Sequence, residues 1–190
     1  APVTDGIVVL TGGITFGQNT NEVGQILRID GRNAIRLQVN GTTTLNGRSA
    51  FAVENGYSGT ATDVYLNGKV TGTGMLIKGP SDSKTRNLHL FNLNSLNDFT
   101  QGTVLQGGTL QVAARAANGA ANTNTNLLVG GLGSGPITLM QGALDLRVDS
   151  AASGAADTDL EFVRYTGSGI GQDVIVKGSS TINVDRTNLQ

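Results

Sequence analysis

The sequence predicts an all-β fold, and within that class it favours a β-solenoid, in which short strands stack in successive coils. The composition is the first indication, because 28 Gly, 22 Thr, 17 Asn and 11 Ser among 190 residues are types that form turns and strand faces rather than helices. Leu, Val and Ile occur in short runs separated by Gly and Asn, which is a second indication. The third is an internal repeat of about 33 residues in the second half of the chain.

Alternation of apolar and polar residues predicts sixteen short strands. They lie at residues 6–10, 13–16, 25–30, 34–39, 49–53, 63–66, 75–78, 87–92, 103–106, 109–113, 126–129, 136–140, 143–148, 160–165, 173–177 and 180–185. The clearest is 143–148, in which Leu144, Leu146 and Val148 are expected to face a core. Three further strands each place two apolar side chains on one face: Leu110 with Val112, Ile137 with Leu139, and Ile182 with Val184.

Five Asn-Gly pairs mark sharp corners, because both residues tolerate a positive φ. They are Asn40-Gly41, Asn46-Gly47, Asn55-Gly56, Asn67-Gly68 and Asn118-Gly119. Such a pair is typical of a two-residue antiparallel hairpin, but the same backbone conformation also forms the corner of a solenoid. An antiparallel β-sandwich is therefore the alternative fold, and the internal repeat favours the solenoid.

The repeat consists of two short strands joined at a Gly-containing corner, and it occurs at residues 102–112 and 135–146. One coil cannot bury its apolar face alone, so neighbouring coils must stack. Three segments, 79–86, 113–126 and 150–159, are expected to be loops inserted at coil corners. Because strands continue on both sides of each loop, we expect a single β-helical domain over residues 1–190.

Residues 94–112 (NSLNDFTQGTVLQGGTLQV) and 132–146 (LGSGPITLMQGALDL) resemble the autotransporter-associated β-strand repeat. That repeat joins a Gly-Gly-Thr-Leu-x-Val strand, a loop and a Leu-Gly-x-Gly-Pro-Val-Thr-Leu segment, and residues 178–184 (GSSTINV) resemble the strand that often follows. The repeat-like motifs thus lie within residues 94–190. The resemblance implies a right-handed parallel β-helix of the kind found in large secreted or surface-displayed bacterial proteins, where such repeats serve as stalks, passengers or adhesive surfaces.

Composition excludes several classes of partner and chemistry. Lys and Arg number 13 against 14 Asp and Glu, with no basic run, so no nucleic-acid partner is expected. The longest apolar stretches, 7–10 and 50–53, are far shorter than the ~18 residues of a membrane-spanning helix. The absence of Cys excludes disulfides and thiolate chemistry. Residues 1–3 are compatible with the product of signal-peptide cleavage, and hence with an extracellular or cell-surface location.

Candidate catalytic groups are few. The single histidine, His89, alternates with Leu88 and Leu90 on a strand and has no nearby acidic residue in the sequence, so we interpret it as a surface residue. Carboxylates gather in one stretch, at Asp145, Asp149, Asp157, Asp159 and Glu161. Asp145 and Arg147 share a strand face and are expected to pair there. No catalytic, cofactor-binding or metal-binding residue is assigned, and we predict that the chain is not an enzyme.

Three other patterns suggest ligands only weakly. Residues 168–176 (SGIGQDVIV) fit a calcium-binding nonapeptide except at Ser168, but a single copy supplies at most half of a site, so calcium binding near Asp173 stays open. The Gly-rich stretches 130–135 and 167–171 are not followed by a helix pattern, which argues against phosphate binding. Threonines that suggest an ice-binding face recur at irregular intervals and are interpreted as strand formers: Thr42, Thr43, Thr44, Thr71, Thr73, Thr109, Thr138 and Thr181.

The sequence thus predicts a non-enzymatic extracellular structural or adhesive module, either a fibre subunit that associates end to end or a segment of a bacterial cell-surface protein. No capping helix pattern is visible near either terminus, so the unpaired backbone of the end coils is expected to recruit another strand. One alternative is a β-helix that binds or degrades polysaccharide through a groove lined by Asp145, Asp149 and Glu161. The other is a pilin-like sandwich subunit whose strand 6–10 completes a neighbour.

Overall fold

The computed structural model of the chain describes residues 6–18, 24–31, 35–55, 63–79, 87–90, 97–114, 132–148 and 172–186. Within these ranges it contains sixteen strands and no helix. The prediction of an all-β fold is therefore confirmed. In the same ranges, no helix with the length and hydropathy needed to cross a membrane was found.

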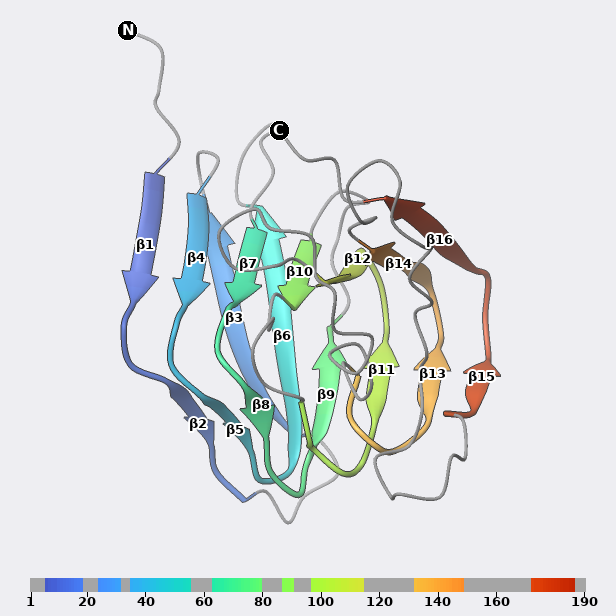
Figure 1. The fold of residues 1–190 in the computed structure, drawn as a ribbon, viewed down its shortest axis with the longest axis horizontal. Coiled ribbons are helices and arrows are strands. Elements are labelled where there is room, and N and C mark those ends of the chain that lie inside the picture. Colours follow the sequence, from blue (N-terminus) through green and yellow to red (C-terminus); the bar gives the residue numbers. More distant parts are fainter. Residues whose placement is uncertain are drawn as a thin grey trace, which may run out of the picture.

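The strands form three sheets, which we call sheets A, B and C (Figure 1). Sheet A has seven strands in the order β1 (Gly6–Leu10), β4 (Ile35–Val39), β7 (Asp63–Leu66), β10 (Asn87–Leu90), β12 (Thr109–Ala114), β14 (Gly142–Val148) and β16 (Ser180–Arg186). Sheet B has three, β2 (Ile14–Phe16), β5 (Thr43–Leu45) and β8 (Val70–Thr71). Sheet C has six, in the order β15 (Val174–Val176), β13 (Ile137–Leu139), β11 (Thr103–Leu105), β9 (Met75–Lys78), β6 (Arg48–Asn55) and β3 (Gln25–Gly31).

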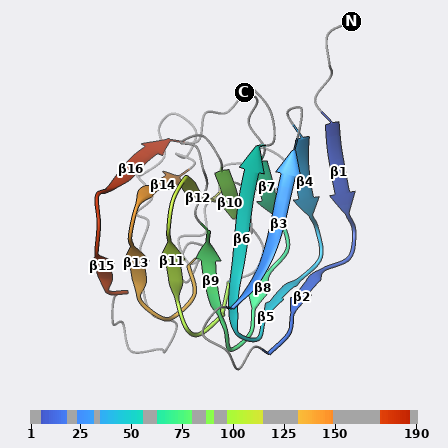
Figure 2. The same ribbon diagram turned by 180° about the vertical axis from the view of Figure 1, so that it is seen from behind.

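The chain passes through the three sheets in a fixed rotation. Strand β1 of sheet A leads to β2 of sheet B and β3 of sheet C, and β4 then returns to sheet A beside β1. We call each passage from sheet A to sheet C a rung. After β9 the described strands alternate between sheets A and C, with β10 followed by β11 and β12 by β13. Residues 97–100, which form no strand, lie beside residues 70–72 through backbone hydrogen bonds from Asp98 to Val70 and from Thr100 to Gly72. Figure 2 shows the strands of sheet C side by side on the far face.

All thirteen strand pairs in the described residues are parallel. An antiparallel β-sandwich requires the opposite pairing, so this alternative fold is wrong for the described part of the chain. Parallel strands cannot be joined by a two-residue hairpin, because the chain must cross over before it returns in the same direction. The pairing is compatible with the predicted β-solenoid.

Apolar side chains from all three sheets meet in one core. Its buried members are Phe16, Val39, Leu45, Phe51, Val53, Val64, Leu66, Val70, Leu76, Phe99, Leu105, Leu110, Val112, Leu132, Ile137, Leu139 and Leu144. The rings of Phe16 and Phe51 meet edge to face, with centroids 5.1 Å apart. Burial of one such side chain stabilises a fold by about 1.5–3 kcal/mol, so the core is the main source of cohesion between rungs.

The core-facing positions follow the predicted alternation. Leu110 and Leu144 are paired in register and both are buried, while Leu146 is partly buried against the same core. Ile182 and Val184 occupy the next positions in the same columns but are 47% and 79% exposed. Ile182 and Val184 are more exposed because β16 is the last of the described strands of sheet A, where β14 is its one described neighbour.

Two of the Asn-Gly pairs form corners that stack on successive rungs. Gly41 and Gly68 follow β4 and β7, where the chain leaves sheet A for sheet B. A Cβ atom on Gly68 would lie 2.1 Å from the carbonyl oxygen of Gly41, so only glycine fits between these backbones. The side chains stack as well, because Asn67 Nδ2 donates to Asn40 Oδ1 at 2.8 Å. The prediction of corners at these two pairs is confirmed, but the predicted reason is wrong: neither Gly41 nor Gly68 has a positive φ, and close stacking of the backbones is what requires glycine.

The other predicted elements have mixed outcomes. Asn46-Gly47 lies between β5 and β6, as predicted, whereas Gly56 and the pair 118–119 lie outside the described residues. The predicted strands 126–129 and 160–165 and loop 150–159 also lie outside them, as does most of loops 79–86 and 113–126. Strands β5 and β8 were not predicted, because runs of three and two residues are too short to show alternation.

Candidate functional site

The outward face of sheet A presents two columns of mostly polar positions. Strand alternation produces them, since Gln38, for example, lies between Leu37 and Val39, which both pack into the core. The first column, which we call the Tyr65 column, contains Val9, Gln38, Tyr65, His89, Gln111, Asp145 and Asn183. The second, the Asp63 column, contains Ile7, Arg36, Asp63, Asn87, Thr109, Ala143 and Thr181.

Tyr65 is held in place by its neighbours on this face. Its side chain is half-buried, and its hydroxyl donates to Asp63 Oδ2 at 3.3 Å. Burial and the negative charge of Asp63 raise the pKa of Tyr65 above its ordinary value of 10.0, while Arg36, in register with Asp63, acts in the opposite direction. Tyr65 therefore keeps its proton at neutral pH and remains a hydrogen-bond donor.

Gln111 and Asp145 form a second polar pair, on adjacent rungs. Gln111 Nε2 donates to Asp145 Oδ2 at 2.8 Å, and the Asp145 side chain is buried. The side chain of Arg147 lies outside the described residues, so its pairing with Asp145 stays a prediction. The other members of the acidic stretch, Asp149, Asp157, Asp159 and Glu161, also lie outside them. Only Asp145 of the expected polysaccharide groove can therefore be placed.

The backbone register places His89 between Tyr65 and Gln111. Its side chain is not among those that the structure describes. The sequence pattern predicts that His89 is a surface strand residue. The backbone register adds that its neighbours in the column are Tyr65 and Gln111.

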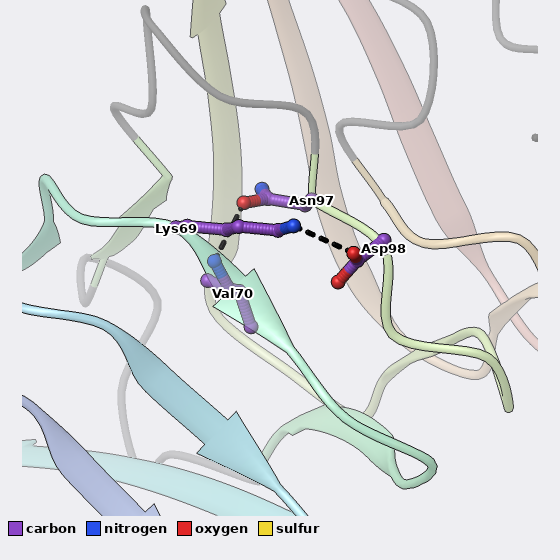
Figure 3. Close-up of polar contacts among 4 residues, drawn as sticks. All are labelled: Lys69, Val70, Asn97 and Asp98. Atoms are coloured by element: carbon purple, nitrogen blue, oxygen red, sulfur yellow. Dashed lines mark hydrogen bonds and ion pairs between the residues drawn. The ribbon is translucent and has the colours of Figure 1, made fainter.

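A second polar arrangement lies where sheet B ends, between β8 and the segment before β11 (Figure 3). Lys69 Nζ lies 2.6 Å from Asp98 Oδ2, forming an ion pair between two successive rungs. Asn97 is buried and its Oδ1 accepts a hydrogen bond from the backbone N–H of Val70 at 2.8 Å. A side-chain amide thus takes the place that the carbonyl of a further strand would have in sheet B.

The ion pair sets the titration of Asp98. Partial burial alone would raise the pKa of Asp98, but hydrogen bonds from Lys69 and Thr71 and the positive charge of Lys69 outweigh it, so the pKa lies below its ordinary value of 3.8. Asp98 is therefore ionised at neutral pH. No sequence pattern predicts this pair, because Lys69 and Asp98 lie 29 positions apart in unrelated local patterns.

Gln172 has a comparable structural role at a later rung. Its Nε2 lies 2.8 Å from the carbonyl oxygen of Gly133 and 2.7 Å from that of Gly135. Thr103 adds a hydrogen bond from its hydroxyl to the carbonyl of Leu132 at 2.9 Å. In the region beyond β8, where the described residues add no further strand to sheet B, polar side chains therefore connect the rungs together with backbone hydrogen bonds such as that from Ser134 to Phe99.

Lys78 is buried although its side chain ends in an amino group. It lies in sheet C in register with Phe51 on one side and Leu105 on the other, and its Nζ donates to the carbonyl oxygen of Gly79 at 3.1 Å. The burial of Lys78 could not be predicted from the sequence. Residues 75–77 are all apolar, so they show no alternation that would assign Lys78 to the inward face.

The structure also places residues of the threonine pattern and of the calcium-binding pattern. Thr15, Thr44 and Thr71 are aligned on three successive rungs of sheet B, so the irregular spacing in the sequence concealed one short threonine ladder. The backbone carbonyl of Asp173 accepts a hydrogen bond from the N–H of Ile137 at 2.8 Å. Among the residues that the structure describes, no three His, Asp or Glu side chains are grouped so that they could hold a metal ion.

Comparison of the chain with protein-family models, with curated proteins and with solved structures found no match.

Proposed function

We propose that this chain is a non-enzymatic structural or adhesive module of an extracellular or cell-surface protein, built as a right-handed parallel β-helix whose end rungs associate with further rungs. The observation that carries the proposal is the single stack of parallel strands with apolar side chains exposed at its two ends. The resemblance of residues 94–112 and 132–146 to a passenger repeat gives independent support for the location.

The handedness follows from general chain geometry. Each rung returns to sheet A by a crossover that joins two parallel strands, as between β1 and β4. Such crossovers are right-handed in about 98% of cases, because strands have a right-handed twist. This general rule supports a right-handed helix for a stack in which every rung adds one parallel strand to sheet A.

The end strands carry the features expected of an association surface. In β1, Ile7, Val8, Val9 and Leu10 are 40–52% exposed, and in β16 Ile182 and Val184 are 47% and 79% exposed. Among the described strands, β1 and β16 are the two edges of sheet A, each with a described neighbour on one side. An edge of this kind recruits another strand unless charge, proline or a bulge protects it.

The internal register predicts how two copies meet. Ile182 continues the apolar column that begins at Val8, and Asn183 continues the outward column that begins at Val9. Pairing β16 of one copy with β1 of the next would extend both columns without interruption. Since neighbouring strands lie about 4.8 Å apart, residues 183 and 9 of two copies would be close enough for a disulfide.

Cysteine cross-linking tests this association directly, because the chain has no cysteine of its own. The double variant Val9→Cys/Asn183→Cys is expected to give a ladder of covalent multimers on non-reducing gels after mild oxidation. In the control Val9→Cys/Thr181→Cys, the two residues would be diagonal neighbours about 7–8 Å apart, too far for an efficient disulfide. Electron micrographs of the cross-linked material should show rods.

Equal cross-linking of both double variants would contradict the proposed register. A monodisperse monomer at high concentration, with no multimer in either variant, would overturn end-to-end association.

The non-enzymatic assignment is supported by the way polar side chains are used. Asn67 bonds Asn40, Gln111 bonds Asp145, and Lys69 pairs with Asp98, and in each case the partners lie on successive rungs. These contacts hold neighbouring rungs together, which is the work expected of a scaffold.

A further inference from the structure

We propose that the outward face of sheet A binds a neutral polysaccharide that lies along the stack, with Tyr65 at the centre of the binding surface. This goes beyond the structural function above and does not depend on end-to-end association, because every residue involved belongs to one copy.

The chemistry of the face matches a hydroxyl-rich ligand. Gln38 and Asn183 present side-chain amides, and Thr109 and Thr181 present hydroxyls, whereas the Gln111 amide donates to Asp145. Amides and hydroxyls both donate and accept hydrogen bonds, as sugar hydroxyls do. A face that offers donors and acceptors in equal measure is suited to a ligand that does the same.

The charges on this face argue for a neutral ligand. Arg36 and Asp63 occupy adjacent positions in one column and have opposite signs. Asp145 is buried and accepts a hydrogen bond from Gln111. The described side chains of the two columns thus include one positive group, Arg36, and two carboxylates, whereas an acidic polysaccharide would require an excess of positive groups.

Tyr65 supplies the aromatic surface. Its ring is half-buried on the outward face, and the hydrogen bond from its hydroxyl to Asp63 fixes its orientation. An amphipathic ring held in one position offers apolar contact area to the C–H face of a sugar with little further loss of conformational entropy. Gln38, in register with Tyr65 on the adjacent strand, can bond the hydroxyls at the edge of the same sugar.

The columns also fit a polymer rather than a single sugar. Successive positions of the Tyr65 column are one strand spacing apart, about 4.8 Å, so a polymer lying along the stack can contact Gln38 and Tyr65 on adjacent rungs and Asn183 at the far end of the column. Weak contacts repeated along one polymer add up, because each later contact is intramolecular.

Affinity electrophoresis in native gels tests the proposal. The full chain is run in gels that contain a neutral soluble glucan, such as dextran or hydroxyethyl cellulose, and in gels that contain polygalacturonate. We expect retardation by a neutral glucan and none by polygalacturonate. Tyr65→Ala should weaken binding by about tenfold or more, because the aromatic contact is lost, and Tyr65→Phe should keep most of the affinity.

Two further variants complete the design. Gln38→Ala should weaken binding severalfold, while Thr44→Ala, on the outward side of sheet B, should leave it unchanged. Thermal melting of each variant shows whether it is folded, and if Tyr65→Ala fails to fold, Gln38→Ala decides the question.

The proposal is overturned if neither glucan retards the protein, if polygalacturonate alone does, or if folded Tyr65→Ala and Gln38→Ala bind as tightly as the wild type. These outcomes can be interpreted even if the cysteine cross-linking described above fails, because binding to one copy does not require association between copies.

Discussion

The ion pair between Lys69 and Asp98 makes one residue-scale contribution to stability that depends on pH. The folded protein holds the pKa of Asp98 below its ordinary value, so the unfolded chain binds this proton more readily than the folded one. The stabilisation is therefore fully present above about pH 4 and is lost as the pH falls through the folded-state pKa. Both side chains are more than a third exposed, at 37% and 38%, and solvent limits the contribution to at most about 1 kcal/mol.

Urea unfolding of the wild type and of Asp98→Asn from pH 6 to pH 2.5 measures this effect. The variant should be slightly less stable at pH 6, and the difference should shrink toward zero below the folded-state pKa. Lys69→Gln, which removes the other partner, should show the same convergence. A difference between wild type and Asp98→Asn that stays constant across the range would contradict the assignment.

At the scale of elements, the corners between sheets A and B depend on glycine. A Cβ atom on Gly68 would meet the carbonyl oxygen of Gly41 at 2.1 Å, and backbone atoms cannot move aside as a flexible side chain can. We expect Gly68→Ala to destabilise the fold by about 3 kcal/mol or more, at the upper end of the range for overpacking.

The same stack of corners contains a matched control. Gly12 lies at the corresponding corner of the first rung, and a Cβ atom there would have no atom within 4 Å. Gly12→Ala should therefore change the free energy of unfolding by no more than about 0.5 kcal/mol. Chemical denaturation of both variants gives the comparison, and equal effects would show that close stacking is not what selects glycine at Gly68.

The elements also show why sequence patterns reveal the strands better than the sites. Alternation identifies a strand from its own residues and located the buried Leu110 and Leu144 correctly, and the Asn-Gly pattern located the corner at Asn67-Gly68. A site on this fold, however, consists of residues one rung apart, and the rungs differ in length: Asn40 and Asn67 are 27 positions apart, whereas Gln111 and Asp145 are 34 apart. No single period connects such partners, so neither the Tyr65 column nor the Lys69 ion pair could be predicted.

At the scale of the whole molecule, a stack of rungs should be least stable at its ends. Each central strand of sheet A has a neighbour on both sides, whereas β1 and β16 have one each and expose apolar side chains. In a repeat array each unit is stabilised mainly by its neighbours, so the end rungs open at lower free energy than the middle.

Amide hydrogen exchange should therefore show a gradient along the chain. At low protein concentration, the amides of β7 and β12 should exchange more slowly than those of β1 and β16, because opening the middle requires disruption of two interfaces between rungs. If copies associate end to end, raising the concentration should slow exchange in β1 and β16 while β7 and β12 change little. The cross-linked Val9→Cys/Asn183→Cys multimer provides the fully associated reference. Uniform protection at low concentration would contradict the stacked-rung account of stability, and end strands that never gain protection with concentration would contradict association through them.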